Sequence, residues 1–330
     1  MFKYVLKRII LALFTMLIIY SILFILIRLY PVENDYWKFN RPWIVQYKEA
    51  VWNIITKFNW GECTTKGELF PPVTRYISTK LKYTFYVTGV SILISIPLGI
   101  LFGIWSAVIK NKFVNGIFNV IILSFGSIPV FVWAFTLQYF LCWKLGIFPF
   151  IFPNGTDLLT LRMFHGAIIP ILALSLGPIS TYMYILRGSL LESYHSDYVA
   201  LLRVKGLSKW QIIRRHTFKN AIVSIFPEIF SNVIFIVTNS FIIEKIFAIT
   251  GLSITYIRTF FALDKLTGDS REWLRTGDLG VVPDYNMFLC ISMFYVAIAV
   301  GTGLLLDLLY GIIDPRIRIG SNKKSEFNEF

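Results

Sequence analysis

The sequence predicts an all-α, polytopic membrane protein with about six transmembrane helices. The 330-residue chain is 56% hydrophobic and only 15% charged, whereas a soluble domain has about 25% charged residues. Its long apolar runs approach the ~20 residues that a helix needs to cross a ~30 Å hydrocarbon core. The basic residues lie mainly between these runs and do not form one patch with aromatic residues, so the net charge of +13 does not indicate nucleic-acid binding.

Six apolar segments are expected to span the membrane. They cover residues 9–29, 84–108, 114–142, 166–187, 221–243 and 286–312. The first segment follows a basic N-terminus, but its apolar run is longer than a signal-peptide core and no small-residue cleavage site follows, so a retained helix is expected. Pro97, Pro129 and Pro170 lie within the segments and predict kinks.

The distribution of charge favours both termini in the cytoplasm. The short segments on that side are dense in Lys and Arg, as the positive-inside rule requires, and most acidic residues fall in the long loops of the other side. The predicted organisation has five parts. They are an N-terminal end with the first helix (1–30), an outer loop with interfacial aromatics (31–83), a transmembrane core (84–320) that includes a cytoplasmic loop (188–220) and an outer loop (244–285), and a cytoplasmic tail (321–330).

The first outer loop contains four tryptophans, Trp37, Trp43, Trp52 and Trp60, with Lys and Glu residues between them. This mixture is typical of helices that lie in the membrane interface. A small folded lid would explain it equally well.

The cytoplasmic loop has the strongest local signals. Asp197 is placed to cap a helix that begins at Tyr198, and Gly206 is placed to end it. Ser208 is a second N-cap candidate, before a basic helix that leads into the fifth span. One interpretation is a basic amphipathic helix that binds lipid headgroups. The other is a rigid structural element that a cytosolic motor protein binds.

Several of these residues resemble a known motif. Asp197-Tyr198, Arg203, Lys205-Gly206-Leu207, Arg215-His216 and Asn220-Ala221 are similar to the coupling loop of the oligopeptide and dipeptide permeases of binding-protein-dependent ABC importers. Further similar fragments follow the same order over most of residues 1–320, among them LKRII (6–10), PWIVQY (42–47), SIPLGILFG (95–103), EKIFAITGL (244–252) and Asp314-Pro315-Arg316.

The resemblance implies a type I ABC importer permease fold and a non-enzymatic role in moving peptides, oligopeptides in particular, across a bacterial cytoplasmic membrane. The implied partners are a homologous second permease, two ATP-binding subunits that hold ATP and Mg, and an extracellular substrate-binding protein. This chain itself would hold no cofactor. The residues implied to contact the ATPase are Asp197, Tyr198, Ala200, Leu201, Arg203, Lys205, Gly206, Leu207 and Ser208.

The sequence departs from the family pattern in two places. The general motif has Glu-Ala-Ala where this chain has Ala200-Leu201-Leu202. Residues 264–283 resemble an insertion in the second outer loop, which puts the docking surface for the binding protein in doubt.

Other function classes lack support in the sequence. No phosphate-binding GxxxxGK[ST] loop occurs, and no HExxH, GxSxG or other metal or catalytic motif occurs either. A stand-alone channel or secondary transporter would show internal repeats, and none is convincing. Nickel, glutathione or another small solute stays an alternative cargo for the same ABC role.

Polar residues within the spans are candidates for a translocation path. Glu228, Asn232 and Asn239 fall within about 40° of one another on a helical wheel and should face the bundle interior, because facing lipid is costly. Hydrogen bonding between helices is the alternative role. Asp307, near the end of the last span, is expected to have a structural role, such as pairing with a base.

Overall fold

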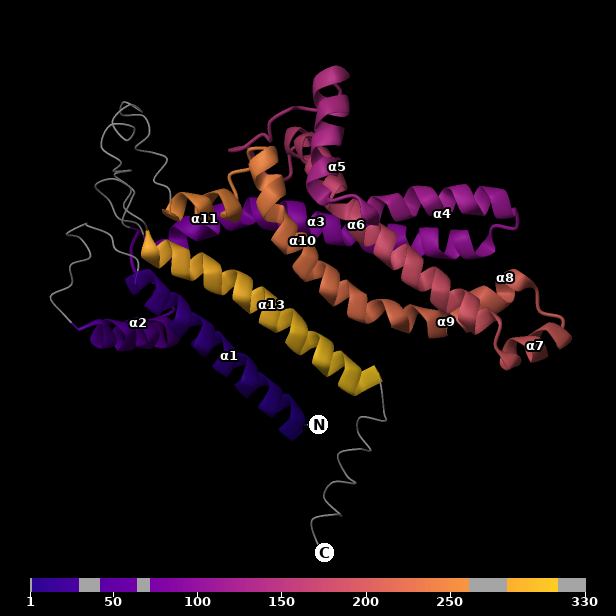
Figure 1. The fold of residues 1–330 in the computed structure, drawn as a ribbon, viewed down its shortest axis with the longest axis horizontal. Helices are drawn as coiled ribbons and strands as arrows, with labels where there is room; N and C mark the ends of the chain where they lie inside the picture. Colours follow the sequence, from indigo (N-terminus) through magenta and orange to yellow (C-terminus); the bar gives the residue numbers. More distant parts are fainter. Residues whose placement is uncertain (1, 30–41, 64–71, 261–283, 314–330) are drawn as a thin grey trace, which may run out of the picture. The chain divides into compact units, whose positions relative to one another are not determined.

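The computed structural model describes residues 2–29, 42–63, 72–260 and 284–313, and the regular secondary structure of these residues is helical (Figure 1). The chain divides into two compact units. Unit 1 comprises Met1–Thr84 and Thr250–Phe330, and unit 2 comprises Phe85–Ile249. Within the described residues, five helices are long and apolar enough to span a membrane, and a sixth span results if one bent pair is counted. The predicted all-α membrane fold is therefore confirmed.

The helices begin and end as follows. They are α1 (Phe2–Leu29), α2 (Trp43–Lys57), α3 (Val73–Val108), α4 (Lys112–Ser127), α5 (Val130–Leu137) with the π-helix η2 (Gln138–Lys144), α6 (Leu161–Tyr194), α7 (Asp197–Val204), α8 (Lys209–Ile212), η3 (Ile213–Thr217), α9 (Phe218–Ala221), η4 (Ile222–Ile225), α10 (Phe226–Ile246), α11 (Leu252–Phe260) and α13 (Tyr285–Ile313). Several helices extend beyond the apolar segments. The loop predicted over 188–220 is shorter in the structure, because α6 continues to Tyr194 and a helical stretch resumes at Lys209.

The segment predicted as one span over 114–142 is not a continuous helix. Helices α4 and α5–η2 meet at a bend of 105°. Ile128 between them is extended, with φ −89° and ψ 130°, which is the conformation that a following proline favours. Pro129 has no N–H to continue the α4 hydrogen-bond ladder, so a new helix begins after it.

Unit 1 is organised around α1 and α13, which lie side by side (Figure 1). Tyr20 and Phe24 of α1 pack against Tyr285 and Phe288 of α13. Helix α2 adds Tyr47 to this cluster, and the Tyr47 hydroxyl is 2.6 Å from the Ser21 hydroxyl. The amphipathic α2 is thereby fixed to the end of α1 that is distant from the N-terminus.

Helix α2 lies in the first predicted outer loop. None of its residues is buried, and Trp43 and Trp52 are exposed. An exposed tryptophan on an amphipathic helix is typical of the membrane interface. Trp37 lies outside the described residues, and the placement of α2 at the outer leaflet stays a prediction.

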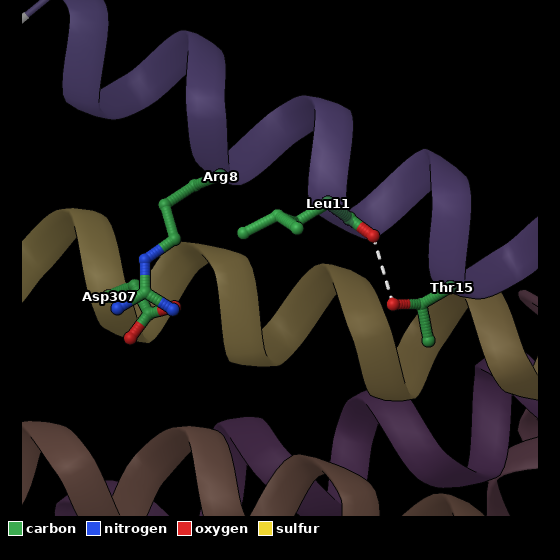
Figure 2. A network of polar contacts seen from close by, with 4 residues as sticks. All are labelled: Arg8, Leu11, Thr15 and Asp307. Carbon is green, nitrogen blue, oxygen red and sulfur yellow. Dashed lines mark hydrogen bonds and ion pairs between the residues drawn. The ribbon is translucent and has the colours of Figure 1, made fainter.

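An ion pair joins the other ends of α1 and α13. Arg8 Nη1 is 2.9 Å from Asp307 Oδ2, and Figure 2 shows the two side chains facing one another between the helices. The structural role expected for Asp307 is thus supported by a basic partner on the first span.

The Arg8–Asp307 pair should make a small contribution to stability. Both side chains are more than a third exposed, and such pairs are worth about 0.2–1 kcal/mol. A double-mutant cycle with Arg8→Gln and Asp307→Asn, measured by thermal unfolding of the full chain in detergent, should give a coupling energy in this range. A coupling above about 2 kcal/mol would mean that the pair is effectively desolvated.

In unit 2, a line of small residues brings α3 close to α6. Ser91, Ser95, Gly99 and Gly103 recur every fourth residue on α3 and are buried. A Cβ atom at Gly99 would lie 2.5 Å from Cβ of Tyr182. Because lipid provides little hydrophobic driving force, membrane helices associate through such close approach.

Hydrogen bonds strengthen the same interface. The Ser91 hydroxyl donates to the Val87 carbonyl of its own helix at 2.7 Å and lies 3.3 Å from the Ile171 carbonyl of α6. The Ser175 hydroxyl likewise donates to the Ile171 carbonyl at 2.7 Å and lies 3.3 Å from the Ser91 carbonyl of α3. Both serines are fully buried. These polar contacts add to the close packing of α3 against α6, the helix that leads into the next loop.

Candidate functional site: the 195–208 loop

The loop between α6 and α8 is built around the short helix α7. Its C-terminal end has the two hydrogen bonds of a Schellman motif: Leu207 N–H donates to the Leu202 carbonyl at 3.2 Å, and Gly206 N–H donates to the Arg203 carbonyl at 2.9 Å. Gly206 has φ +81°, a left-handed conformation that glycine adopts without steric cost. The predicted helix stop at Gly206 is confirmed.

The N-terminal end of α7 differs from the prediction. The N-cap is Ser196, with φ −74° and ψ 155°, and Asp197 is the first helical residue. No side chain caps this end, since Ser196 Oγ donates instead to the Ser193 carbonyl at 2.6 Å. The Asp197 carboxylate still lies in the first turn, where the helix dipole favours a negative charge.

Ser208 forms the second N-cap, as predicted. Gln211 N–H donates to Ser208 Oγ at 3.4 Å, and Ser208 N–H donates to Gln211 Oε1 at 2.9 Å. This reciprocal capping box satisfies two of the free donors at the start of α8. The helical stretch that it starts runs from Lys209 to Ile246, so the loop is directly connected to the fifth span.

One side of the loop is anchored and the other is exposed. Val199 of α7 is completely buried. The flanking helices contribute to a buried apolar cluster formed by Ala107, Tyr182, Leu186, Leu190, Ile213, Ala221 and Ile225. Leu201 and Val204 of α7 and Trp210 of α8 are 66%, 87% and 53% exposed.

The loop thus exposes three large apolar side chains. Ala200, Arg203, Lys205, Gly206 and Ser208 are exposed as well, and Leu207 is half-buried. The sequence-based set did not include Val204 or Trp210. The three-residue spacing of Leu201 and Val204 on α7 was the signal that would have included Val204.

Tyr194, at the end of α6, contacts a basic residue from each of the helices α7 and α8. The Arg203 guanidinium carbon lies 4.5 Å from the centre of the Tyr194 ring, and Lys209 Nζ lies 5.6 Å from it. Asn220 Nδ2 also donates to the Tyr198 hydroxyl at 3.4 Å. Arg203 and Tyr198, expected from the resemblance to contact a partner, thus also have contacts within the chain.

Replacement of Tyr194 should loosen the loop. Cation–π contacts at exposed sites are worth about 0.5–1 kcal/mol each, so Tyr194→Leu should make the loop more accessible, whereas Tyr194→Phe keeps the ring and should behave like the parent. The rate of limited trypsin cleavage at Arg203 and Lys205 in the detergent-solubilised chain measures this. Equal cleavage rates for the Leu and Phe variants would show that the ring contacts do not position the loop.

Of the three polar residues of α10, Glu228 and Asn232 contact one another, whereas Asn239 does not contact either of them in the described structure. Asn232 is 6% exposed, and its Nδ2 donates to the Glu228 carbonyl at 3.0 Å and to Glu228 Oε1 at 3.4 Å. The phenol of Tyr182 lies near Asn232 and Glu228 but makes no hydrogen bond of ordinary geometry within the described chain. Asn239 Nδ2 donates to the carbonyl of Phe235 in its own helix at 2.9 Å. Glu228 and Asn232 are thus grouped, Asn239 is apart, and a translocation role stays a prediction.

Comparison with known proteins identifies the class of transport component. A family described as "Binding-protein-dependent transport system inner membrane component" matches residues 99–319, which include the whole loop, the bent helix pair and the last three candidate spans. The chain belongs to this family. The predicted resemblance to ABC importer permeases is thereby confirmed, and the chain is a multi-pass membrane permease component.

Similar proteins extend the match over almost the whole permease. The dipeptide transport system permease protein DppB of Lactococcus lactis subsp. cremoris is 27% identical, over 97% of this chain and 100% of the relative. The oligopeptide transport system permease protein OppB of Mycoplasma genitalium is 27% identical, over 98% of this chain and 78% of the relative. The crystal structure of an amino acid ABC transporter covers 73% of this chain and 95% of the solved chain, with a TM-score of 0.51 and 15% identity. This last similarity shows a shared fold.

Proposed function

We propose that this permease is one of two membrane subunits of an ATP-driven importer that moves peptides across the cytoplasmic membrane. The 195–208 loop carries the proposal, because it is a rigid, internally anchored element with an exposed apolar and basic outer side. The names of the similar dipeptide and oligopeptide permeases support peptide as the cargo.

The proposed partners follow from the chemistry of the loop and from the family. Leu201, Val204 and Trp210 would enter an apolar groove of an ATP-binding subunit, and Arg203 and Lys205 would meet acidic residues at its rim. ATP and Mg would be bound and ATP hydrolysed in two such subunits. A second permease would complete the pathway, a binding protein would deliver the peptide outside, and both termini of this chain would be cytoplasmic.

Affinity purification from the native membrane, followed by reconstitution, tests this function. We expect a second permease and ATP-binding subunits to co-purify, and the proteoliposomes to take up labelled peptide only with ATP and binding protein present. Competition by dipeptides, by longer peptides and by nickel or glutathione would define the cargo. Uptake by the chain alone, independent of ATP, would contradict the proposal and favour a channel or secondary transporter.

A further inference from the structure

Unit 2 contains a pocket that the proposed transport function does not use. Its volume is about 660 Å³, which lies within the range of about 300–1,000 Å³ for small-molecule sites. The segment that joins η2 to α6 and the beginning of α6 form its wall. The lining residues include Ile147, Phe148, Ile151, Pro153, Arg162 and His165.

Contacts within unit 2 hold the joining segment against its neighbours. The Phe152 N–H donates to the Phe247 carbonyl at 3.0 Å, and the Phe152 side chain is buried. Gly166 of α6 lets the segment come close, because a Cβ atom there would lie 2.3 Å from Pro153 Cδ. The wall of the pocket is thus a packed part of unit 2.

The charged side of the pocket is basic. Arg162 and His165 are three residues apart at the start of α6, so they lie on one face of the helix. The His165 ring packs on Phe148, with the ring centres 4.9 Å apart and the planes inclined by 30°. The Arg162 guanidinium is exposed and forms no ion pair or hydrogen bond with the described residues. Asp157, the one acidic residue between positions 145 and 165, does not line the pocket.

Large apolar side chains are exposed beside the basic pair. Ile147 and Ile151 line the pocket and are 52% and 61% exposed. Leu161 and Phe164, in the same part of α6 as the two basic residues, are also exposed. A ligand that matches both properties has an anionic group and an apolar part.

The position of the pocket along the spans indicates the source of such a ligand. Helix α6 is long and apolar enough to span the membrane, and the pocket lies at the end of α6 that is distant from the 195–208 loop. Tyr139 and Trp143 of η2, the helix that leads into the pocket segment, are exposed, and exposed Tyr and Trp are typical of the headgroup level. We propose that the pocket binds the phosphate of an anionic phospholipid such as phosphatidylglycerol.

In this site the Arg162 guanidinium donates two N–H groups to phosphate oxygens, the bidentate geometry that arginine favours. The imidazole of His165 donates an N–H to a third oxygen of the lipid. The first carbons of an acyl chain contact Ile147 and Ile151. Phosphatidylethanolamine is disfavoured, because its ammonium group is close to the phosphate and Arg162 would repel it.

Native mass spectrometry of the full-length chain, released from micelles that contain equal amounts of phosphatidylglycerol and phosphatidylethanolamine, tests the proposal. We expect phosphatidylglycerol to be retained preferentially. Arg162→Gln should weaken its retention about tenfold, because charged hydrogen bonds are removed. Lys144→Gln is the matched control: Lys144 is an exposed base near the same segment that does not line the pocket, and its variant should retain the lipid normally.

A second measurement separates lipid binding from folding. Because Arg162 is exposed, the thermal midpoint of Arg162→Gln in lipid-free detergent should equal that of the parent. Equal retention of both lipids by the parent, or equal losses in Arg162→Gln and Lys144→Gln, would overturn the proposal, the latter by showing general attraction to positive charge. Displacement of phosphatidylglycerol by a short peptide would also overturn it, by showing that the pocket recognises a peptide carboxylate. These outcomes do not depend on uptake activity, so the proposed transport function is tested separately.

Discussion

Replacing Gly99 by leucine is expected to prevent correct packing of α3 against α6. A Cβ atom at this position would lie 2.5 Å from Tyr182 Cβ and 3.1 Å from the Ile179 carbonyl oxygen. Neither atom is the flexible end of a side chain, so the helices themselves must separate. Overpacking of this kind costs about 3 kcal/mol, and separation would also strain the Ser91–Ser175 contacts. The yield of monodisperse, full-length chain in detergent and its thermal midpoint should both fall strongly.

Gly89 provides the matched control on the same helix. Within the part of the chain that the structure describes, no atom lies within 4 Å of a Cβ atom built there, so Gly89→Leu should fold like the parent. Gly103 is intermediate, with its nearest neighbour, Leu186 Cβ, at 3.0 Å, and Gly103→Ala should give a smaller loss than Gly99→Leu. A defect of equal size at Gly89 and Gly99 would mean that glycine is needed for helix insertion or flexibility, and not for close packing with α6.

The sequence predicted the features that depend on local signals. Apolar runs of sufficient length gave the spans, and the Gly206 stop and the Ser208 cap follow from residues next to each other in the chain. The break at Pro129 illustrates the limit. Pro97 and Pro170 lie within the continuous helices α3 and α6, whereas Pro129 separates two helices. All three prolines lie in similar apolar segments, so their presence alone does not distinguish a continuous helix from a break.

The candidate site also combines features that the local sequence predicts with contacts that it does not predict. The common face of Glu228 and Asn232 was predictable from helical periodicity alone, and the two side chains do contact one another. The contact between the Tyr194 ring and the Arg203 guanidinium was not predictable. Nothing in the local sequence pattern indicates that the end of α6 and the end of α7 lie close together. The resemblance predicts that Arg203 contacts a partner subunit. In the structure Arg203 also contacts Tyr194 of its own chain.

Replacing Gly206 by leucine should leave membrane insertion intact and abolish most ATP-coupled uptake. Gly206 has φ +81°, and no atom of the described residues lies within 4 Å of a Cβ atom at this position. The effect would therefore come from the backbone, because a left-handed conformation costs an L-residue about 1–2 kcal/mol. That energy would reduce the population of the correct loop about 5–30-fold. Uptake of labelled peptide into vesicles that contain the complete transporter, divided by the amount of inserted chain, measures the loss.

Asparagine is the matched substitution, since it is similar in size to leucine but adopts the left-handed conformation more readily. Gly206→Asn should therefore keep most of the uptake that Gly206→Leu loses. The comparison separates two reasons for a glycine at this position. If both variants fail equally, the partner surface requires the absence of a side chain, and the loop conformation is secondary. If Gly206→Leu transports normally, the Schellman turn is not needed for coupling and the assignment of the 195–208 loop to the ATP-binding subunit is wrong.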